Sequence, residues 1–237
     1  MKIIFFSDAH GNLYAIRQFF KDIKNISYDQ LIFGGDVFGY YYEADAILSI
    51  FREKNVHCLL GNHDRMFLDL LEGTRAEQEL VNRYGNSYRG ISSKISKDNI
   101  KFLYSLSDRY ELETDGLRLV FVHGTLIDEL NGRIYPDTVI KNFADYKEIS
   151  VVFSGHTHHK MIRKLPNGCT IINPGSIGQQ RDGKGCSYVI FDTNQFLYEI
   201  RIVYYDLNQL IKDIMLMEKE SEIREKLIKV LLRKQYF

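Results

Sequence analysis

The chain has little proline and no excess of charge of either sign. Only 3 of its 237 residues are proline, and it is 45% hydrophobic and 26% charged. This composition, without low-complexity runs, excludes a disordered chain and is typical of a globular core. Lysine and arginine total 31, as do aspartate and glutamate. The overall charge therefore draws the protein neither to nucleic acid nor to an anionic membrane, and any affinity for a polyanion must be local.

Cysteine is also scarce. Cys58, Cys169 and Cys186 are an odd number with wide spacing, which predicts buried thiols in a reducing compartment. The apolar start, residues 1–6, is too short for a signal-peptide core or a membrane span. We therefore expect a cytoplasmic protein with no membrane insertion.

Short apolar runs alternate along the chain with segments of helical period. Between the first two runs, Leu13, Ile16, Phe20 and Ile23 recur at helical spacing, which predicts a strand, a helix and a strand, and hence a sheet covered by helices. The runs that predict strands are residues 2–6, 30–33, 57–60, 117–122, 150–153, 170–172, 187–191 and 197–203.

The length fits a single domain, residues 1–237. Within it, residues 65–110 are polar with a helical pattern, and we expect them to decorate one end of the sheet. Residues 206–237 are expected to form a C-terminal helical tail, because Asp206 and Gln209 have the spacing of a capping box.

Histidine is the most informative residue type. The chain has 7 histidines, and five of them lie in short polar segments that each follow a predicted strand. Loops at the carboxyl ends of strands converge over one edge of an α/β sheet, where ligands bind. We therefore expect one crevice built from residues 7–12 (SDAHGN), 34–36 (GGD), 61–64 (GNHD), 122–124 (VHG) and 154–158 (SGHTH).

The side chains in these segments suit a metal site. Carboxylate, amide and imidazole ligands without a thiolate favour Mn²⁺, Fe²⁺, Co²⁺, Ni²⁺ or Zn²⁺. Asp-x-His and His-x-His place two ligands on one face of an extended segment, and Asp36, after two glycines, is the carboxylate suited to bridge two cations. Each motif alone is equally consistent with a turn, a helix cap or polar surface, but their combination favours a metal centre. His57 and His159 fit ordinary structural roles.

The five motifs, in this order, resemble the calcineurin-like metallophosphoesterase superfamily. The similarity covers about residues 1–205, and it includes Asn173-Pro174-Gly175-Ser176 and Gln180-Arg181-Asp182-Gly183, which resemble a segment typical of its small bacterial and archaeal phosphodiesterases. The resemblance implies an α/β fold, a four-layer α/β/β/α sandwich of two mixed sheets flanked by helices, with a dinuclear metal site at one end.

The resemblance also implies a role for each site residue. His63 would be the catalytic histidine, with Asp64 to orient it. The implied activity is hydrolysis of a phosphate ester by a metal-bound hydroxide, with two divalent ions as cofactors, Mn²⁺ favoured over Fe, Ni, Co or Zn, and with His63 protonating the leaving group. The implied ligands are Asp8, His10, Asp36 and His158 for the first metal, and Asp36, Asn62, His123 and His156 for the second.

The sequence departs from the relatives that act on phosphoproteins. Those carry Asp-Arg-Gly after the bridging aspartate and a glutamate after the catalytic histidine, whereas here Val37-Phe38-Gly39-Tyr40 follow Asp36, and Asp64 follows His63. Without that arginine a dianionic monoester loses a bidentate clamp. We therefore expect phosphodiester or phosphoanhydride substrates.

Three further residues are candidates for substrate binding: Asn12, Tyr40 and Arg181. Tyr40, Tyr41 and Tyr42 are adjacent and are suited either to stacking a nucleobase or to packing the start of the next helix. Arg181 is suited either to binding phosphate or to holding a surface loop. The expected partner is a small phosphate ester or nucleotide.

Two alternatives to a phosphodiesterase remain open. One is a dinucleoside polyphosphate hydrolase, and the other is a protein-binding scaffold, because the same fold serves in a retromer subunit with a degraded site. His63 beside a complete ligand set favours an enzyme. Stable nucleic-acid binding is not expected, because the chain has no basic stretch, and the sequence carries no signal for an oligomeric state.

Overall fold

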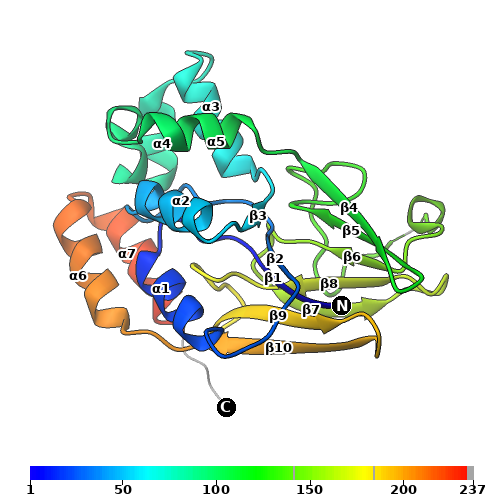
Figure 1. The fold of residues 1–237 in the computed structure, drawn as a ribbon. Coiled ribbons are helices and arrows are strands. Elements are labelled where there is room, and N and C mark those ends of the chain that lie inside the picture. Colours follow the sequence, from blue (N-terminus) through cyan, green and yellow to red (C-terminus); the bar gives the residue numbers. More distant parts are fainter. Residues whose placement is uncertain (141, 184, 234–237) are drawn as a thin grey trace.

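The computed structural model describes residues 1–140, 142–183 and 185–233. Two five-stranded mixed sheets stack face to face, and helices gather on one side of this sandwich (Figure 1). The predicted α/β sandwich of two mixed sheets flanked by helices is confirmed.

The first sheet has the strand order β10-β9-β1-β2-β3. Strands β1, β2 and β3 run parallel, and β9 is antiparallel to both of its neighbours. Helices α1 and α2 cover the outer face, where aromatic side chains such as Phe6 and Phe51 pack together. The elements are β1 (Lys2–Phe6), α1 (Leu13–Asp22), β2 (Gln30–Phe33), α2 (Ala44–Glu53), β3 (His57–Cys58), β9 (Cys186–Asp192) and β10 (Leu197–Val203).

The second sheet has the order β4-β5-β6-β8-β7, with β5, β6 and β8 parallel and the two edge strands antiparallel. Its outer face is covered by the segment that joins β5 to β6, in which Ile134, Tyr146 and Ile149 are buried. The described part of this segment contains one short helical element, the 3₁₀ turn η3 (Ala144–Tyr146). The strands are β4 (Arg109–Thr114), β5 (Leu117–Val122), β6 (Val151–Phe153), β7 (Lys160–Lys164) and β8 (Thr170–Pro174).

An aromatic core lies between the two sheets. The rings of Phe121 and Phe153 stack with centroids 4.6 Å apart, and Phe5 meets Phe153 from the first sheet at 5.3 Å. Residues of β1 alternate between this core and the core under the helices, so Ile3 and Phe5 face inward while Ile4 and Phe6 face α1. Burial on both faces explains why β1 is a continuous apolar run in the sequence.

Residues 62–104 form the helical part at one end of the sandwich (Figure 1). These elements are α3 (Asn62–Leu71), α4 (Glu77–Tyr84), the 3₁₀ turns η1 (Asn86–Tyr88) and η2 (Ile91–Ser93), and α5 (Lys97–Tyr104). Helix α3 follows β3 directly, so the GNHD segment forms its first turn.

Two C-terminal helices, α6 (Leu207–Met217) and α7 (Ser221–Leu231), pack together on Tyr41 through Leu210, Ile214 and Leu227. The carboxylate of Asp206 caps α6, but it accepts from the backbone N–H of Asn208 rather than from that of Gln209. The part of the expected tail beyond residue 233 lies outside the described residues.

The three cysteines are buried free thiols, as predicted. Among the described residues, no helix has both the length and the apolar character needed to span a membrane.

Candidate metal centre

Every predicted metal ligand lies at the carboxyl end of a strand, where the two sheets meet. Asp8 and His10 follow β1, and Asp36 follows β2. The remaining ligands are Asn62 in the first turn of α3, His123 after β5, and His156 and His158 after β6. All seven side chains are buried, with at most 7% of any of these residues exposed.

The ligand atoms form two adjoining groups. In the first, Nε2 of His158 lies 3.2 Å from Oδ1 of Asp8 and 3.0 Å from Nε2 of His10. In the second, Nε2 of His123 lies 3.3 Å from Oδ2 of Asp36 and 3.0 Å from Oδ1 of Asn62.

Asp36 lies between these two groups. Its Oδ2 is 3.7 Å from Nε2 of His10 on one side and 3.3 Å from Nε2 of His123 on the other. His156 completes a cluster with Asp36 and His123 in which the ligand atoms lie within 4.8 Å of one another. The carboxylate of Asp36 therefore faces both clusters at once.

The second nitrogen of each ring explains why the histidines face inward. Nδ1 of His10 lies 2.7 Å from the carbonyl of Phe38, and Nδ1 of His158 lies 2.6 Å from the carbonyl of Gln179. Likewise, Nδ1 of His123 lies 2.8 Å from a carbonyl, that of Gly34. A carbonyl only accepts, so each Nδ1–H donates. When the ring is neutral, Nε2 then presents a lone pair, which is the arrangement of metal-binding histidines.

This arrangement fits a divalent cation better than a network of hydrogen bonds. With both Nδ1 atoms protonated, the neutral rings of His10 and His158 oppose two lone pairs only 3.0 Å apart, and two acceptors at that distance repel. Nε2 of His156 is buried and has no hydrogen-bond partner, which is costly in a protein interior. A cation in the first group would relieve the repulsion between His10 and His158, and a cation in the second would give Nε2 of His156 a partner, so the residues present fit metal ions.

The pKa values agree with a site built for cations. Burial lowers the pKa of His10 well below its ordinary range and that of His156 to about 4, so both rings are neutral and ready to bind a metal. Burial also acts to lower the pKa of His123, but the charge of Asp36 overrides it and raises this pKa to about 10. Asp36 thus strongly favours a positive charge beside it.

The backbone at the site is strained. A non-glycine residue with positive φ is uncommon, and such residues cluster at functional sites. Five of the seven predicted ligands have positive φ: Asp8 (61°), His10 (48°), Asp36 (67°), His156 (63°) and His158 (59°).

The loops after β1 and β6 also approach each other closely. At Gly155 an added Cβ would lie 2.2 Å from Oγ of Ser7 and 2.7 Å from Oδ2 of Asp8, so these loops meet without room for a side chain.

His63 faces the same cluster from the first turn of α3. Its backbone N–H donates to Oδ1 of Asp36 at 2.7 Å, and its ring lies 4.9 Å from that of His10. One of its ring nitrogens groups with His10 and Asp36 as a further metal-ligand set. Burial lowers the pKa of His63 to about 4.

Asp64 does not orient the ring of His63, contrary to the expectation from the sequence. Its carboxylate accepts from the backbone N–H groups of Gly61, Asp36 and Val37 at 2.8–2.9 Å, so it fixes the loop that carries Asp36. The ring of His63 instead contacts the hydroxyl of Tyr88. Tyr88 lies 25 residues further along the chain, in a stretch without a motif.

The predicted substrate-binding residues occupy different environments. Tyr40 lies at the cluster, with its ring 4.8 Å from that of His10, and Nη2 of Arg181 donates to its hydroxyl at 2.8 Å. Asn12 is completely buried, where its Oδ1 caps α1 and its Nδ2 donates to the carbonyl of Gly178 and to the hydroxyl of Tyr205. Its polar atoms are thus engaged within the protein.

Tyr41 and Tyr42 serve the fold. Tyr41 is buried among the side chains of the C-terminal helices, and the hydroxyl of Tyr42 donates to the carboxylate of Glu218 at 3.0 Å. Of the three adjacent tyrosines, Tyr40 alone lies against the histidines of the cluster.

The Asn-Pro-Gly-Ser segment supports the metal loops. Nδ2 of Asn173 donates to the carbonyl of Gly155 at 2.6 Å, and the hydroxyl of Ser176 donates to the carbonyl of Asp8 at 2.7 Å. These bonds tie the end of β8 to the loops after β6 and β1.

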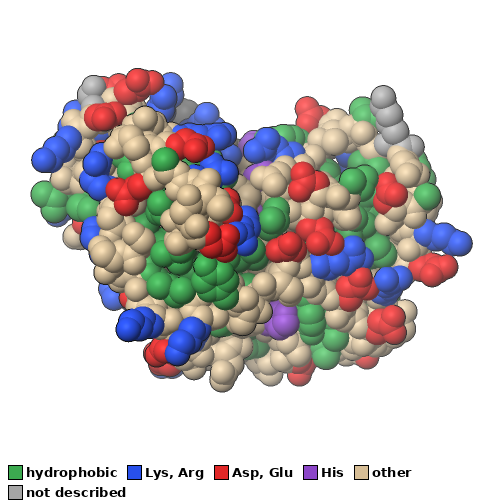
Figure 2. Space-filling model, turned by 90° about the horizontal axis from the view of Figure 1, so that it is seen from above, with side chains coloured by type: hydrophobic (Ala, Val, Ile, Leu, Met, Phe, Trp, Pro, Cys, Tyr) green, Lys and Arg blue, Asp and Glu red, His purple; other side chains and the backbone are tan. Residues whose placement is uncertain are grey.

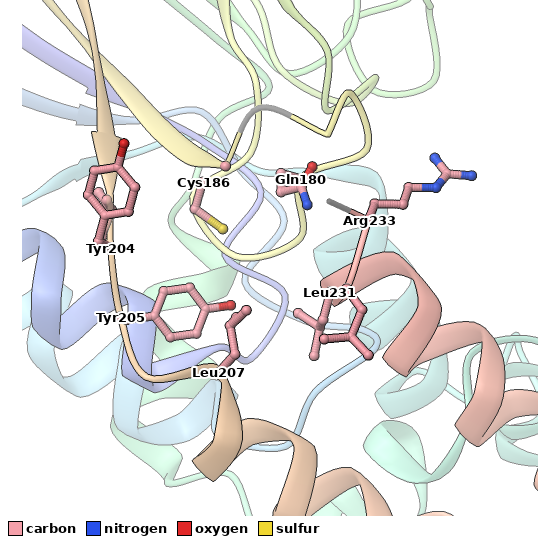
Figure 3. A pocket seen from close by; sticks show the side chains of 10 residues that line it. Gln180, Cys186, Tyr204, Tyr205, Leu207, Leu231 and Arg233 are labelled. Carbon is pink, nitrogen blue, oxygen red and sulfur yellow. The ribbon is translucent and has the colours of Figure 1, made fainter. Parts of the chain in front are cut away.

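One face of the molecule is hollowed between two parts of the surface. Figure 2 shows histidine side chains within a notch between two parts of the molecule, with Lys and Arg side chains beside it. A separate cavity of about 320 Å³ lies against the C-terminal helices (Figure 3). Gln180, Cys186, Tyr205 and Leu231 line this cavity, and none of the predicted metal ligands does.

The described residues thus include groups of buried histidine and aspartate side chains that could hold metal ions. A family model, the calcineurin-like phosphoesterase superfamily domain, matches residues 1–195. The chain belongs to this superfamily, whose members typically bind divalent metals and hydrolyse phosphoric esters.

Individual proteins are similar to this chain in sequence or in fold. An uncharacterized protein of Methanocaldococcus jannaschii is 30% identical over 222 residues, which cover 86% of this chain and 87% of that protein. The crystal structure of a metallophosphoesterase from Sphaerobacter thermophilus is similar in fold, with a TM-score of 0.76, 23% identity, and coverage of 96% of this chain and 99% of that one. A hypothetical protein from Pyrococcus horikoshii gives a TM-score of 0.77 at 15% identity, with 95% and 97% covered.

Proposed function

We propose that this protein is a dinuclear metal-dependent phosphodiesterase. The observation that carries the proposal is the place of Asp36, whose Oδ2 lies 3.7 Å from Nε2 of His10 and 3.3 Å from Nε2 of His123. A carboxylate shared by two clusters of lone-pair donors is suited to bridge two cations. One ion would be held by Asp8, His10, Asp36 and His158, and the other by Asp36, Asn62, His123 and His156.

The donor set narrows the choice of metal. It consists of imidazole, carboxylate and amide groups without a thiolate, which suits Mn²⁺, Fe²⁺, Co²⁺, Ni²⁺ or Zn²⁺. When bound, two such ions supply a water nucleophile at neutral pH and neutralise charge on the phosphoryl oxygens.

The protein's own side chains would supply the remaining chemistry. His63 would move a proton at Nε2 to the departing oxygen. Burial lowers its pKa to about 4, and the negative charge of a bound phosphate would act in the opposite direction. Arg181, which donates to the hydroxyl of Tyr40 beside His10, would reach a non-bridging phosphate oxygen.

The substrate we favour is a phosphodiester, including nucleotide-like diesters. The loop after Asp36 carries Val37, Phe38 and Gly39, without a cation to clamp a dianionic monoester. A diester carries one negative charge, so it requires fewer cationic groups for binding. The guanidinium group of Arg181 lies over the ring of Tyr40 and is the cation that we propose contacts the substrate.

Kinetics and metal analysis on the same sample test this proposal. The values of kcat/KM for bis(p-nitrophenyl) phosphate and p-nitrophenyl phosphate would be compared in Mn²⁺, Ni²⁺ and Zn²⁺, with dinucleoside polyphosphates as the competing substrate class. We expect about two ions per chain and a preference for the diester. A higher kcat/KM for dinucleoside polyphosphates would show that these, and not phosphodiesters, are the substrate class. Absence of turnover with every ester would favour the protein-binding scaffold.

Arg181→Gln tests the phosphate contact. We expect a raised KM at unchanged metal content, because the cation lies beside the cluster rather than among its ligands. Arg201→Gln is the matched control, since Arg201 lies on the edge strand β10 and pairs with Glu199. Equal effects of the two substitutions would remove Arg181 from the site.

A further inference from the structure

A buried hydroxyl, that of Tyr88, contacts the ring of His63. Tyr88, at the end of η1, is completely buried, and its hydroxyl oxygen lies 2.9 Å from Nδ1 of His63. The same hydroxyl lies 3.2 Å from the backbone carbonyl of His63. The carbonyl only accepts, so the hydroxyl donates its hydrogen there and its oxygen accepts from Nδ1–H of the ring.

This pair of hydrogen bonds favours the tautomer of His63 that carries its proton on Nδ1. With the proton held on Nδ1, Nε2 of the neutral ring carries a lone pair. The histidines expected to bind metal are set in the same way, because Nδ1 of His10 and of His158 donates to a backbone carbonyl. At His63 the acceptor is a side chain, so a substitution can remove it without changing the backbone.

Other contacts hold the ring without defining its proton. An added Cβ on Gly39 would lie 2.4 Å from Nδ1 of His63, so the β2 loop closes tightly on that side. The ring of Tyr84 packs edge to face on His63, with centroids 4.5 Å apart. These neighbours restrict the position of the imidazole, whereas the hydroxyl of Tyr88 also determines which nitrogen faces the cluster.

The segment that carries Tyr88 is itself anchored. The carboxylate of Glu218, at the end of α6, accepts from the backbone N–H of Asn86 at 2.8 Å and from the hydroxyl of Tyr42 at 3.0 Å. Glu218 is only 1% exposed. The C-terminal helices therefore fix the turn on which Tyr88 lies.

We propose that Tyr88 is a positioning residue that sets the tautomer of His63 and directs its Nε2 to the metal centre. The proposal rests on the proposed function for the role of His63 in turnover. Its structural part, the tautomer, stands independently of activity.

Tyr88→Phe is the direct test, because it keeps the ring and removes the hydroxyl. Loss of a hydrogen-bonding partner behind a site histidine typically costs about 10- to 100-fold. We expect a fall of that size in kcat on an alkyl or nucleotide ester, with metal content unchanged. Tyr146→Phe is the matched control, since it removes the hydroxyl of a buried tyrosine on the outer face of the second sheet, and it should change kcat less than about 2-fold.

A double-mutant cycle separates positioning from a general structural effect. In a His63→Ala background, Tyr88→Phe should cause no further loss, because the group that it orients is gone. An equal loss of kcat in both backgrounds, or loss of metal in Tyr88→Phe, would overturn the proposal.

The tautomer can be read by nitrogen NMR of the imidazole rings. The chain has 7 histidines, and the signals missing from His63→Ala assign those of His63. We expect the Nδ1–H tautomer in the wild type and a mixture in Tyr88→Phe. An Nε2–H tautomer in the wild type would refute the positioning role, whereas the expected tautomer in a protein without phosphoesterase activity would refute only the proposed function.

Discussion

Asp36→Asn removes one charge from the centre of the site and changes little else. In the wild type, Oδ1 of Asp36 accepts from the backbone N–H of His63 at 2.7 Å, and Oδ2 faces Nε2 of both His10 and His123. An asparagine retains the first interaction through its amide oxygen. We therefore expect the fold to persist while the shared carboxylate is lost.

The expected magnitude follows from the position of Asp36 between both clusters. Residues that only hydrogen-bond to metal ligands typically contribute about 10- to 100-fold to metal affinity. Loss of a ligand shared by two ions should therefore weaken the binding of each ion by at least about 100-fold, or about 2.7 kcal/mol. Turnover should fall with metal content, because the remaining ligands no longer hold the pair of ions together.

The assay is equilibrium dialysis against Mn²⁺ with kinetics on the same sample. Asp213→Asn is the matched control, because its carboxylate accepts a partly buried hydrogen bond from the hydroxyl of Tyr14, between α1 and α6. It should bind metal like the wild type. Wild-type turnover of Asp36→Asn with both ions bound would refute the bridging role.

Three further substitutions test the surroundings of the site. His63→Ala should keep both metals and lose about 10²- to 10⁴-fold in rate, more for alkyl than for nitrophenyl esters; metal loss would make His63 a ligand. Gly39→Ala should displace the ring of His63 and, because φ is +89°, cost about 1–2 kcal/mol in urea unfolding; unchanged kcat would contradict this. Glu218→Ala should lower stability by about 1 kcal/mol by removing the acceptor of the partly buried donors of Tyr42 and Asn86, unlike Lys219→Ala nearby.

Strands β1, β2 and β5 could be predicted because the sandwich buries them on both faces, and they have the predicted bounds. The edge strand β10 also has the predicted bounds, because apolar residues recur along it, although only Val203 in it is buried. β4 and β7 were missed because they are antiparallel edge strands in which charged residues such as Arg109, Glu111 and Lys160 interrupt the apolar pattern. Their strand character depends on pairing with β5 and β8, which no local pattern records.

The predicted metal ligands lie together because each comes at the end of a parallel strand, and topology brings those ends to one place. The residues that contact His63 and the Asp36 loop could not be predicted in the same way. Tyr88 reaches His63 from a turn with no motif, and Asp64, although adjacent to His63 in sequence, points at the backbone of the Asp36 loop. Side-chain direction in the first turn of a helix decides such contacts, and adjacency in sequence does not reveal it.

The number of divalent ions bound per chain at saturation tests the central claim most directly. Metal-free protein would be titrated with Mn²⁺ and the bound metal measured after dialysis. The arrangement of Asp8, His10 and His158 on one side of Asp36 and of Asn62, His123 and His156 on the other predicts about two ions per chain, with hydrolysis of a phosphodiester appearing as both sites fill. A saturated stoichiometry of one or none, with phosphodiesterase activity unaffected by removal of metal, would contradict the assignment.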